Sequence, residues 1–192
     1  MKILLLDNYD SFTYNLYQCV KKLVNTKVDV LRNDKISLEE VKGYDKILLS
    51  PGPGLPSESG ILLPLIKEYA AKKSILGVCL GLQAIGESFG GKLLNMGKVR
   101  HGVASEIHIQ KRTVKPNDVF KNLPDTISGG RYHSWIVDKK GFPDVLEITA
   151  MDEKGDIMAL QHKTLDVQGV QFHPESILTP EGNQIIKNWL HI

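Results

Sequence analysis

The chain has 192 residues, 42% of them hydrophobic and 24% charged, with a formal net charge of +2 at pH 7; this is typical of one soluble globular domain over residues 1–192. The near balance of charge, without a dense basic stripe, gives no electrostatic basis for nucleic-acid binding. Two cysteines, Cys19 and Cys79, provide neither a disulfide framework nor metal-ligand spacing, so we expect a cytoplasmic protein with no metal site.

Strand and helix patterns alternate through the first half of the chain. The apolar run KILLL at 2–6 predicts a strand, and because it stops at Asp7 it is too short for a signal peptide or a membrane span. Apolar residues then recur with helical spacing, with Asp10 or Ser11 available as the N-cap. The next segments predict strands at 27–31, 45–50 and 74–78, and helices from the capping box at 37–40, over 61–72 and after residue 79.

The second half is richer in strands. The final segment, 179–190, predicts a helix with Thr179 as its N-cap and Pro180 in its first position. We therefore expect an α/β fold, a three-layer, flavodoxin-like, mostly parallel sheet with helices on both faces and antiparallel additions in the C-terminal half. The strands predicted in this half are at 105–110, 134–138, 145–150, 157–161 and 167–172.

Cys79 stands between two glycines at the junction of a predicted strand and a predicted helix. Gly77 and Gly81 would relieve crowding in a sharp turn of this kind. The sulfur would then project at the carboxyl edge of the sheet, and the helix N-terminus would favour its thiolate. The amide of Leu80 would face a developing oxyanion. Cys79 is therefore the candidate nucleophile, whereas Cys19, on the apolar face of the first helix, is interpreted as a structural cysteine.

A second elbow-like motif, GESFG at 86–90, would make Ser88 the nucleophile. The motif requires a strand before it and a helix after it. Here it ends a helical pattern with no strand before it, so we do not expect Ser88 to be catalytic.

A base and its orienting carboxylate are candidates in VQGVQFHPES at 167–176. We expect the strand to end at Phe172 and Pro174 to bias His173 towards extended geometry. His173 and Glu175 would then project to the same side, so that Glu175 accepts from one imidazole nitrogen while the other faces the thiol. The alternative is a surface turn with an incidental ion pair. The cysteine elbow favours the catalytic interpretation.

The loop SPGPG at 50–54 directly follows a predicted strand. Its glycines and prolines would hold a fixed turn whose exposed amides can complete an oxyanion hole or bind a carboxamide or carboxylate. The lysine and hydroxyl residue of a phosphate-binding loop are missing. A plain turn is the alternative.

Taken together, PGPG after a strand, G-x-C-x-G-x-Q at 77–83 and H-P-E at 173–175 resemble the class I, triad-type glutamine amidotransferases. The resemblance covers essentially the whole chain, through LLLDNYDSFTYNL, GVCLGLQAIGESFGG, GRYHSW and VQFHPES. It implies that Cys79 attacks the carboxamide of L-glutamine, that His173 transfers protons and that Glu175 orients His173. The glutamine and oxyanion pocket that it implies comprises Gly52, Pro53, Gly54, Leu80, Gln83, Ser134 and Trp135.

Two positions depart from the family pattern. Trp135 stands where relatives usually carry leucine, and Val103 stands where lysine is common, in the loop RHGVAS at 100–105. The departures affect the shape of the pocket and the contacts of that loop with a partner. His101, in the same loop, is not expected to be catalytic.

The resemblance further implies a partner. The motifs are similar to those of amidotransferase subunits that feed ammonia to chorismate-using synthases, so we expect a hetero-oligomer with a chorismate-binding synthase subunit. We expect no cofactor in the amidotransferase itself. Anthranilate synthase is the main expectation and aminodeoxychorismate synthase the alternative. A stand-alone cysteine hydrolase of a related fold, a non-catalytic binding subunit, and an amidotransferase of the GMP or carbamoyl phosphate pathway are weaker alternatives.

Overall fold

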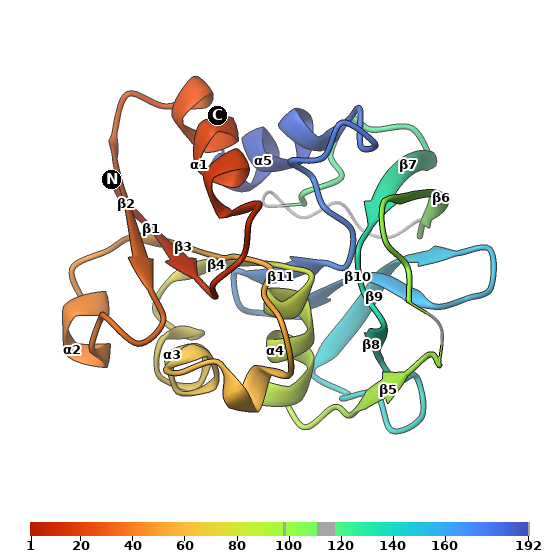
Figure 1. The fold of residues 1–192 in the computed structure, drawn as a ribbon, viewed down its shortest axis with the longest axis horizontal. Coiled ribbons are helices and arrows are strands. Elements are labelled where there is room, and N and C mark those ends of the chain that lie inside the picture. The colour runs from red at the N-terminus through yellow and green to blue at the C-terminus, as the bar shows by residue number, and fades with distance from the viewer. Residues whose placement is uncertain (98, 111–117, 192) are drawn as a thin grey trace.

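A nine-stranded sheet forms the centre of the computed structural model, which describes residues 1–97, 99–110 and 118–191 (Figure 1). Its strand order is β2-β1-β3-β4-β11-β10-β9-β6-β7. From β2 to β11 all neighbours are parallel, and from β11 to β7 all are antiparallel. The expected parallel sheet with antiparallel additions is confirmed. The strands are β1 (Lys2–Asp7), β2 (Lys27–Arg32), β3 (Lys46–Leu49), β4 (Ser74–Val78), β6 (Val103–Ile109), β7 (Thr126–Arg131), β9 (Leu146–Asp152), β10 (Ile157–His162) and β11 (Val167–Val170).

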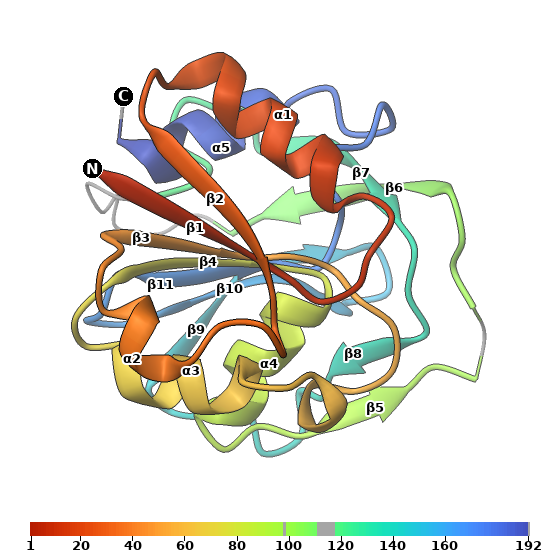
Figure 2. The same ribbon diagram turned by 60° about the vertical axis from the view of Figure 1, so that its left-hand side comes forward.

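Helices cover both faces of the sheet, α1 and α5 on one and α2, α3 and α4 on the other (Figure 2). Successive side chains of a strand point to opposite faces. Ile3 and Leu5 of β1 therefore join the core under α1 and α5, while Leu4 and Leu6 join the core on the other side. Burial on both faces explains why the run KILLL is continuously apolar. The helices are α1 (Thr13–Leu23), α2 (Leu38–Val41), α3 (Leu62–Tyr69), α4 (Leu80–Ser88) and α5 (Gly182–Leu190), with a short 3₁₀ turn at Pro56–Glu58.

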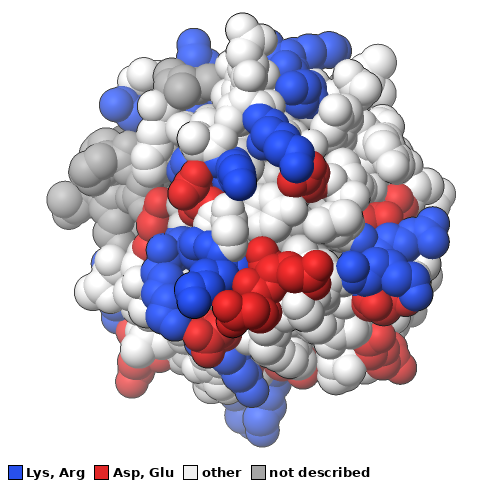
Figure 3. All heavy atoms as spheres, turned by 90° about the vertical axis from the view of Figure 1, so that its left-hand side faces the viewer, with Lys and Arg blue, Asp and Glu red and all other residues white. Residues whose placement is uncertain are grey.

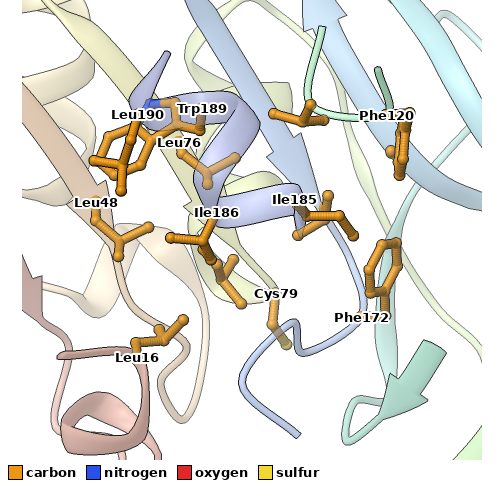
Figure 4. Packing of buried hydrophobic residues seen from close by; sticks show 14 of the residues in the cluster. Leu16, Leu48, Leu76, Cys79, Phe120, Phe172, Ile185, Ile186, Trp189 and Leu190 are labelled. Atoms are coloured by element: carbon orange, nitrogen blue, oxygen red, sulfur yellow. The ribbon is translucent and has the colours of Figure 1, made fainter. Parts of the chain in front are cut away.

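Helix α5 packs onto the sheet through one apolar face, which is shown in close-up in Figure 4. The face places aliphatic and indole side chains over Leu48 and Leu76 of the parallel strands, and Cys79 lies at the edge of the same core. The predicted helical face is thereby confirmed. Its residues, all buried, are Ile185, Ile186, Trp189 and Leu190.

The predicted helix caps are confirmed at one helix and wrong at two. Ser37 and Glu40 form the expected capping box of α2. Helix α1 has Phe12 as its N-cap, without a side-chain capping bond, whereas Asp10 accepts from the Phe12 N–H at 2.8 Å in the turn before the helix. Helix α5 begins only at Gly182, because the Thr179 hydroxyl is engaged elsewhere, donating to the carbonyl of His173 at 2.7 Å.

Four strands of the structure differ from the sequence expectation. β8 (Trp135–Val137) pairs with β5 (Leu93–Asn95) in a separate two-stranded sheet, and β5 and β7 were not predicted. β11 ends at Val170 rather than at residue 172. Strand β7, last in the sheet order, reaches back to the chain beyond β11, where Gly130 forms an antiparallel bridge with His173.

The surface mixes charges of both signs on the face shown in Figure 3, where acidic and basic side chains are interspersed. Within the part of the chain that the structure describes, no helix is long and apolar enough to cross a membrane.

Candidate active site

Cys79 alone connects β4 to α4, in a backbone conformation with φ of 52° and ψ of −102°. A positive φ is strained for a residue with a side chain. The two flanking glycines are required by close approach: a Cβ on Gly77 would lie 2.4 Å from the backbone of Gly81, and a Cβ on Gly81 would lie 2.7 Å from the carbonyl oxygen of Leu49. The strained elbow predicted from the glycine spacing is confirmed.

Parallel pairing of β4 with β11 brings the candidate base to the elbow. Val170 lies opposite Val78, and the Cys79 N–H donates to the Val170 carbonyl at 2.8 Å. His173 is 1% exposed, and its Nδ1 lies 2.7 Å from Oε1 of Glu175, which is also buried. The predicted contact between His173 and Glu175 is present, but the predicted reason for it, an extended backbone, is wrong. The backbone after His173 forms a turn.

The electrostatics of His173 favour the protonated ring. Burial by itself lowers its pKa, but the Cys79 sulfur on one side and the Glu175 carboxylate on the other outweigh burial and raise the pKa to about 10. Nε2 is enclosed and has no hydrogen-bond partner among the described residues. The Cys79 group acts on the imidazole as a whole by raising its pKa. The arrangement suits a protonated imidazole beside the sulfur of a candidate nucleophile.

Two aromatic rings fix the plane of the His173 imidazole. Phe12 meets it edge-on with 5.5 Å between ring centroids, and Tyr132 packs at 4.7 Å. Phe12 comes from the N-terminal motif and Tyr132 from GRYHSW, and sequence reasoning assigned neither a role because their partner lies far along the chain.

A cavity of about 210 Å³ opens beside the Cys79 sulfur. It is smaller than the roughly 300–1,000 Å³ of pockets for drug-sized ligands, so it suits a small ligand. Of the predicted pocket residues, Leu80 does not line it but packs behind Gly52, where a Cβ would lie 2.8 Å from the Leu80 side chain. The sequence had no signal for Val99 or His133 in the wall. The lining residues are Gly52, Pro53, Gly54, Cys79, Gln83, Val99, Tyr132, His133, Ser134 and Trp135.

The PGPG loop is a fixed turn, as predicted. Its Gly52 lies against the N-terminal segment, where a Cβ would be 2.6 Å from the carbonyl oxygen of Asn8, and Gly54 has a φ of +72°. Asn8 braces the loop from that side: its N–H donates to Oγ of Ser50 at 2.8 Å, and its side-chain amide donates to the Ser50 carbonyl at 2.9 Å. The role of Asn8 was not anticipated from the sequence.

Buried amides connect the cavity wall to the sulfur. Nε2 of Gln83 lies 2.8 Å from the carbonyl oxygen of Trp135 and 3.3 Å from Oε1 of Gln171, while Nε2 of Gln171 lies 3.5 Å from Sγ of Cys79. Trp135 makes this contact through its backbone, so an indole in place of leucine leaves the contact unchanged. Sequence reasoning missed Gln171, although VQFHPES contains it.

Three residues that the sequence analysis set aside lie outside this arrangement. Ser88 is the last residue of α4 and so does not stand at a strand-to-helix turn. Cys19 is half-buried on α1, where burial raises the pKa of its thiol. His101 is exposed and does not line the cavity, and its ring lies 5.6 Å from that of Tyr132. Residues 1–97, 99–110 and 118–191 contain no cluster of three or more His, Cys, Asp or Glu that could hold a metal ion.

The comparisons with known proteins agree with this geometry. Residues 4–192 match the family described as glutamine amidotransferase class-I. The chain belongs to this family. As a whole, this amidotransferase is 50% identical over 192 residues to anthranilate synthase component 2 of Cyanophora paradoxa, with 98% of each chain covered. It is 45% identical over 191 residues to aminodeoxychorismate synthase component 2 of Escherichia coli K12, with 98% of this chain and 99% of the relative covered.

The fold of the amidotransferase is also found among solved structures. The crystal structure of a protein described as part of a GMP synthase, from Thermoplasma acidophilum, matches it with a TM-score of 0.86 at 25% identity. The match covers 99% of this chain and 92% of the other. The three-layer fold expected from the sequence is therefore shared with a solved relative.

Proposed function

We propose that this amidotransferase is the glutamine-hydrolysing subunit of an anthranilate synthase, delivering ammonia to a chorismate-using synthase subunit. The observation that carries the proposal is the buried imidazole of His173 between the Cys79 sulfur and the Glu175 carboxylate, beside a small cavity. The full-length similarity to an anthranilate synthase component 2 supports the choice of synthase.

The first half of the reaction forms a thioester. The Cys79 thiolate attacks the carboxamide carbon of L-glutamine, and the electron pair of the C=O bond moves to oxygen. The amide of Leu80, the first of α4, and those of the Gly52 loop donate to this oxyanion. His173 then gives its Nε2 proton to the nitrogen, the C–N bond breaks, and ammonia leaves.

The second half restores the enzyme. Neutral His173 takes a proton from water, whose oxygen attacks the thioester carbon; the C–S bond breaks, and glutamate and the thiolate are released. Glu175 accepts from Nδ1 throughout, which keeps Nε2 directed at the reacting atoms. Gly52, Pro53, Gly54, Gln83, Ser134 and Trp135 hold the glutamine. The chemistry requires no cofactor in this subunit, and a cytoplasmic location remains a prediction from the sequence.

Aminodeoxychorismate synthase is the second candidate. The 45% identity over nearly the full length of the E. coli component 2 supports it. Both candidates require the same kind of partner, a chorismate-binding subunit.

The deciding experiment isolates the partner and assays the complex. We expect the tagged chain to copurify with a synthase subunit, and the complex to form fluorescent anthranilate from chorismate and glutamine. Aminodeoxychorismate as the product would select the second candidate. Peptide hydrolysis without ammonia release from glutamine would contradict both and favour a cysteine hydrolase.

A further inference from the structure

We infer that Gln171 is a further catalytic residue of this amidotransferase, whose side-chain amide donates a hydrogen bond to the Cys79 sulfur and holds it as the thiolate. The inference deepens the proposed function and rests on it. It concerns a residue that is not part of the Cys79, His173 and Glu175 set.

The position of Gln171 is fixed by its surroundings. It is fully buried, directly after β11, and its own N–H donates to the carbonyl of Met158 at 2.8 Å. The preceding carbonyl, that of Val170, accepts from the Cys79 N–H. The last residue of β11 therefore contacts the elbow through its backbone, and the next residue contacts it through Nε2 of Gln171, 3.5 Å from Sγ.

Which atom of the Gln171 amide faces the sulfur can be assigned from the hydrogen bonds of Gln83. Oxygen and nitrogen of a side-chain amide are easily exchanged, so each must be assigned from its partners. The Trp135 carbonyl can only accept, so the Gln83 atom at 2.8 Å is the NH₂ group. The same NH₂ group lies 3.3 Å from Gln171, which therefore presents its oxygen to Gln83 and its NH₂ group to the sulfur.

A second set of bonds holds the carbonyl from which this assignment starts. The guanidinium of Arg131 donates from Nε to Nε2 of His133, at 3.1 Å, so His133 carries its proton on Nδ1 and donates it to the Trp135 carbonyl at 2.9 Å. Arg131 is itself paired with Asp152 at 2.5 Å, and both are buried. The Trp135 carbonyl thus receives two donors and cannot turn away.

The sulfur must consequently accept from Gln171. A thiolate accepts strongly and a thiol only weakly, so a fixed donor favours the ionised form. The ionisable group at the sulfur is His173, with Glu175 behind it and with Asp10 and His133 interacting with the imidazole from further away. Gln171 carries no charge, and its replacement by another neutral residue leaves all of these groups in place.

The test measures the ionisation of Cys79 directly. In the full chain with Cys19→Ser, the rate of alkylation by iodoacetamide is followed against pH for Gln171→Met, which has a similar length and no donor. We expect the alkylation rate of Cys79 at neutral pH to fall about 10–100-fold, as for loss of one hydrogen bond to a charged group. The kcat for glutamine should fall at neutral pH and recover at higher pH, with little change in KM.

A matched control lies three residues earlier, on strand β11. Gln168 of β11 is also buried, and its side chain accepts from the N–H of Val119 rather than contacting Cys79. Gln168→Met should leave the alkylation profile unchanged. Gln171→Asn, which withdraws the amide from the sulfur but stays polar, carries the same expectation as Gln171→Met and replaces it if that variant does not fold.

The outcomes separate this inference from the proposed function. An unchanged alkylation profile together with wild-type kcat in folded Gln171→Met would overturn the role of Gln171 while leaving glutamine hydrolysis intact. Failure of the wild-type complex to release ammonia from glutamine would instead overturn the proposed function. The alkylation profile needs no turnover and still reports on the Gln171 contact in that case.

Discussion

The elbow between β4 and α4 and the middle of α1 each carry a cysteine, in very different surroundings. Cys79 sits at a positive φ with Gln171 and His173 beside its sulfur. Cys19 lies on a regular helix, where burial first and then the negative charge of Glu175 raise the pKa of its thiol. Both thiols are at least partly buried, so burial does not distinguish them. The two cysteines differ instead in the groups around the sulfur and in the backbone conformation that presents it.

The strongest test of this contrast removes each thiol in turn. Cys79→Ala should lower glutamine-dependent turnover of the complex by at least on the order of 10²-fold, because the nucleophile is lost. Cys19→Ala should stay close to the wild-type rate. Product formation with added ammonium salt, which bypasses the glutaminase step, is the control and should be unchanged in both variants. A Cys79→Ala complex that still used glutamine at the wild-type rate would contradict the assignment of Cys79 as the nucleophile.

Adding a methyl group to the elbow tests the backbone part of the contrast. In Gly81→Ala the new Cβ would lie 2.7 Å from the carbonyl oxygen of Leu49, so the chain must shift, and we expect a loss of about 1–3 kcal/mol in unfolding free energy with reduced glutaminase activity. Gly43→Ala is the matched control, since its Cβ would meet the Glu40 carbonyl oxygen at an ordinary 3.6 Å. Denaturant unfolding of both variants measures the difference. Equal stabilities would show that the elbow tolerates a side chain.

The most gradual expected effect, spread over several pH units, concerns His133, which supports the elbow through the Trp135 carbonyl. Burial and the Arg131 charge lower its pKa from 6.5 to about 3. Between these values the unfolded chain binds a proton that the folded chain does not, so stability should fall as pH drops from 6.5 towards 3, by at most about 1.4 kcal/mol per pH unit. His133→Gln, which does not titrate, should show a shallower slope in denaturant unfolding against pH. An equal slope in both proteins would contradict the shifted pKa.

Features set by a few neighbouring residues were predictable from the sequence. The glycine spacing around Cys79 predicted the elbow because a Cβ on Gly77 would meet the backbone of Gly81, only four positions along the chain. Ser37 and Glu40 predicted the capping box because they are three positions apart. The parallel half followed from continuous apolar runs. These are local patterns, which are readable without knowing what lies across the fold.

Contacts between distant segments were not predictable. Gln171 reaches Cys79 from 92 positions further along the chain, and nothing in VQF distinguishes its side chain from that of an exposed glutamine. Strand β7 was missed because its glycines replace the apolar residues that mark a strand. A Cβ on Gly129 would lie 2.4 Å from the Ile107 side chain, and one on Gly130 would lie 2.9 Å from Oγ of Ser176. Tertiary packing selected these glycines.

The contact between Gly130 of β7 and His173, after β11, determines at which stage the catalytic base is positioned. The His173 N–H donates to the Gly130 carbonyl at 2.9 Å, and the Thr179 hydroxyl joins the two segments by accepting from the Gly130 N–H, at 2.9 Å, while donating to the His173 carbonyl. The imidazole is therefore positioned as the chain folds, before any glutamine is bound. The reorganisation needed to reach the transition state is correspondingly reduced, because the backbone of the proton carrier is already held in place.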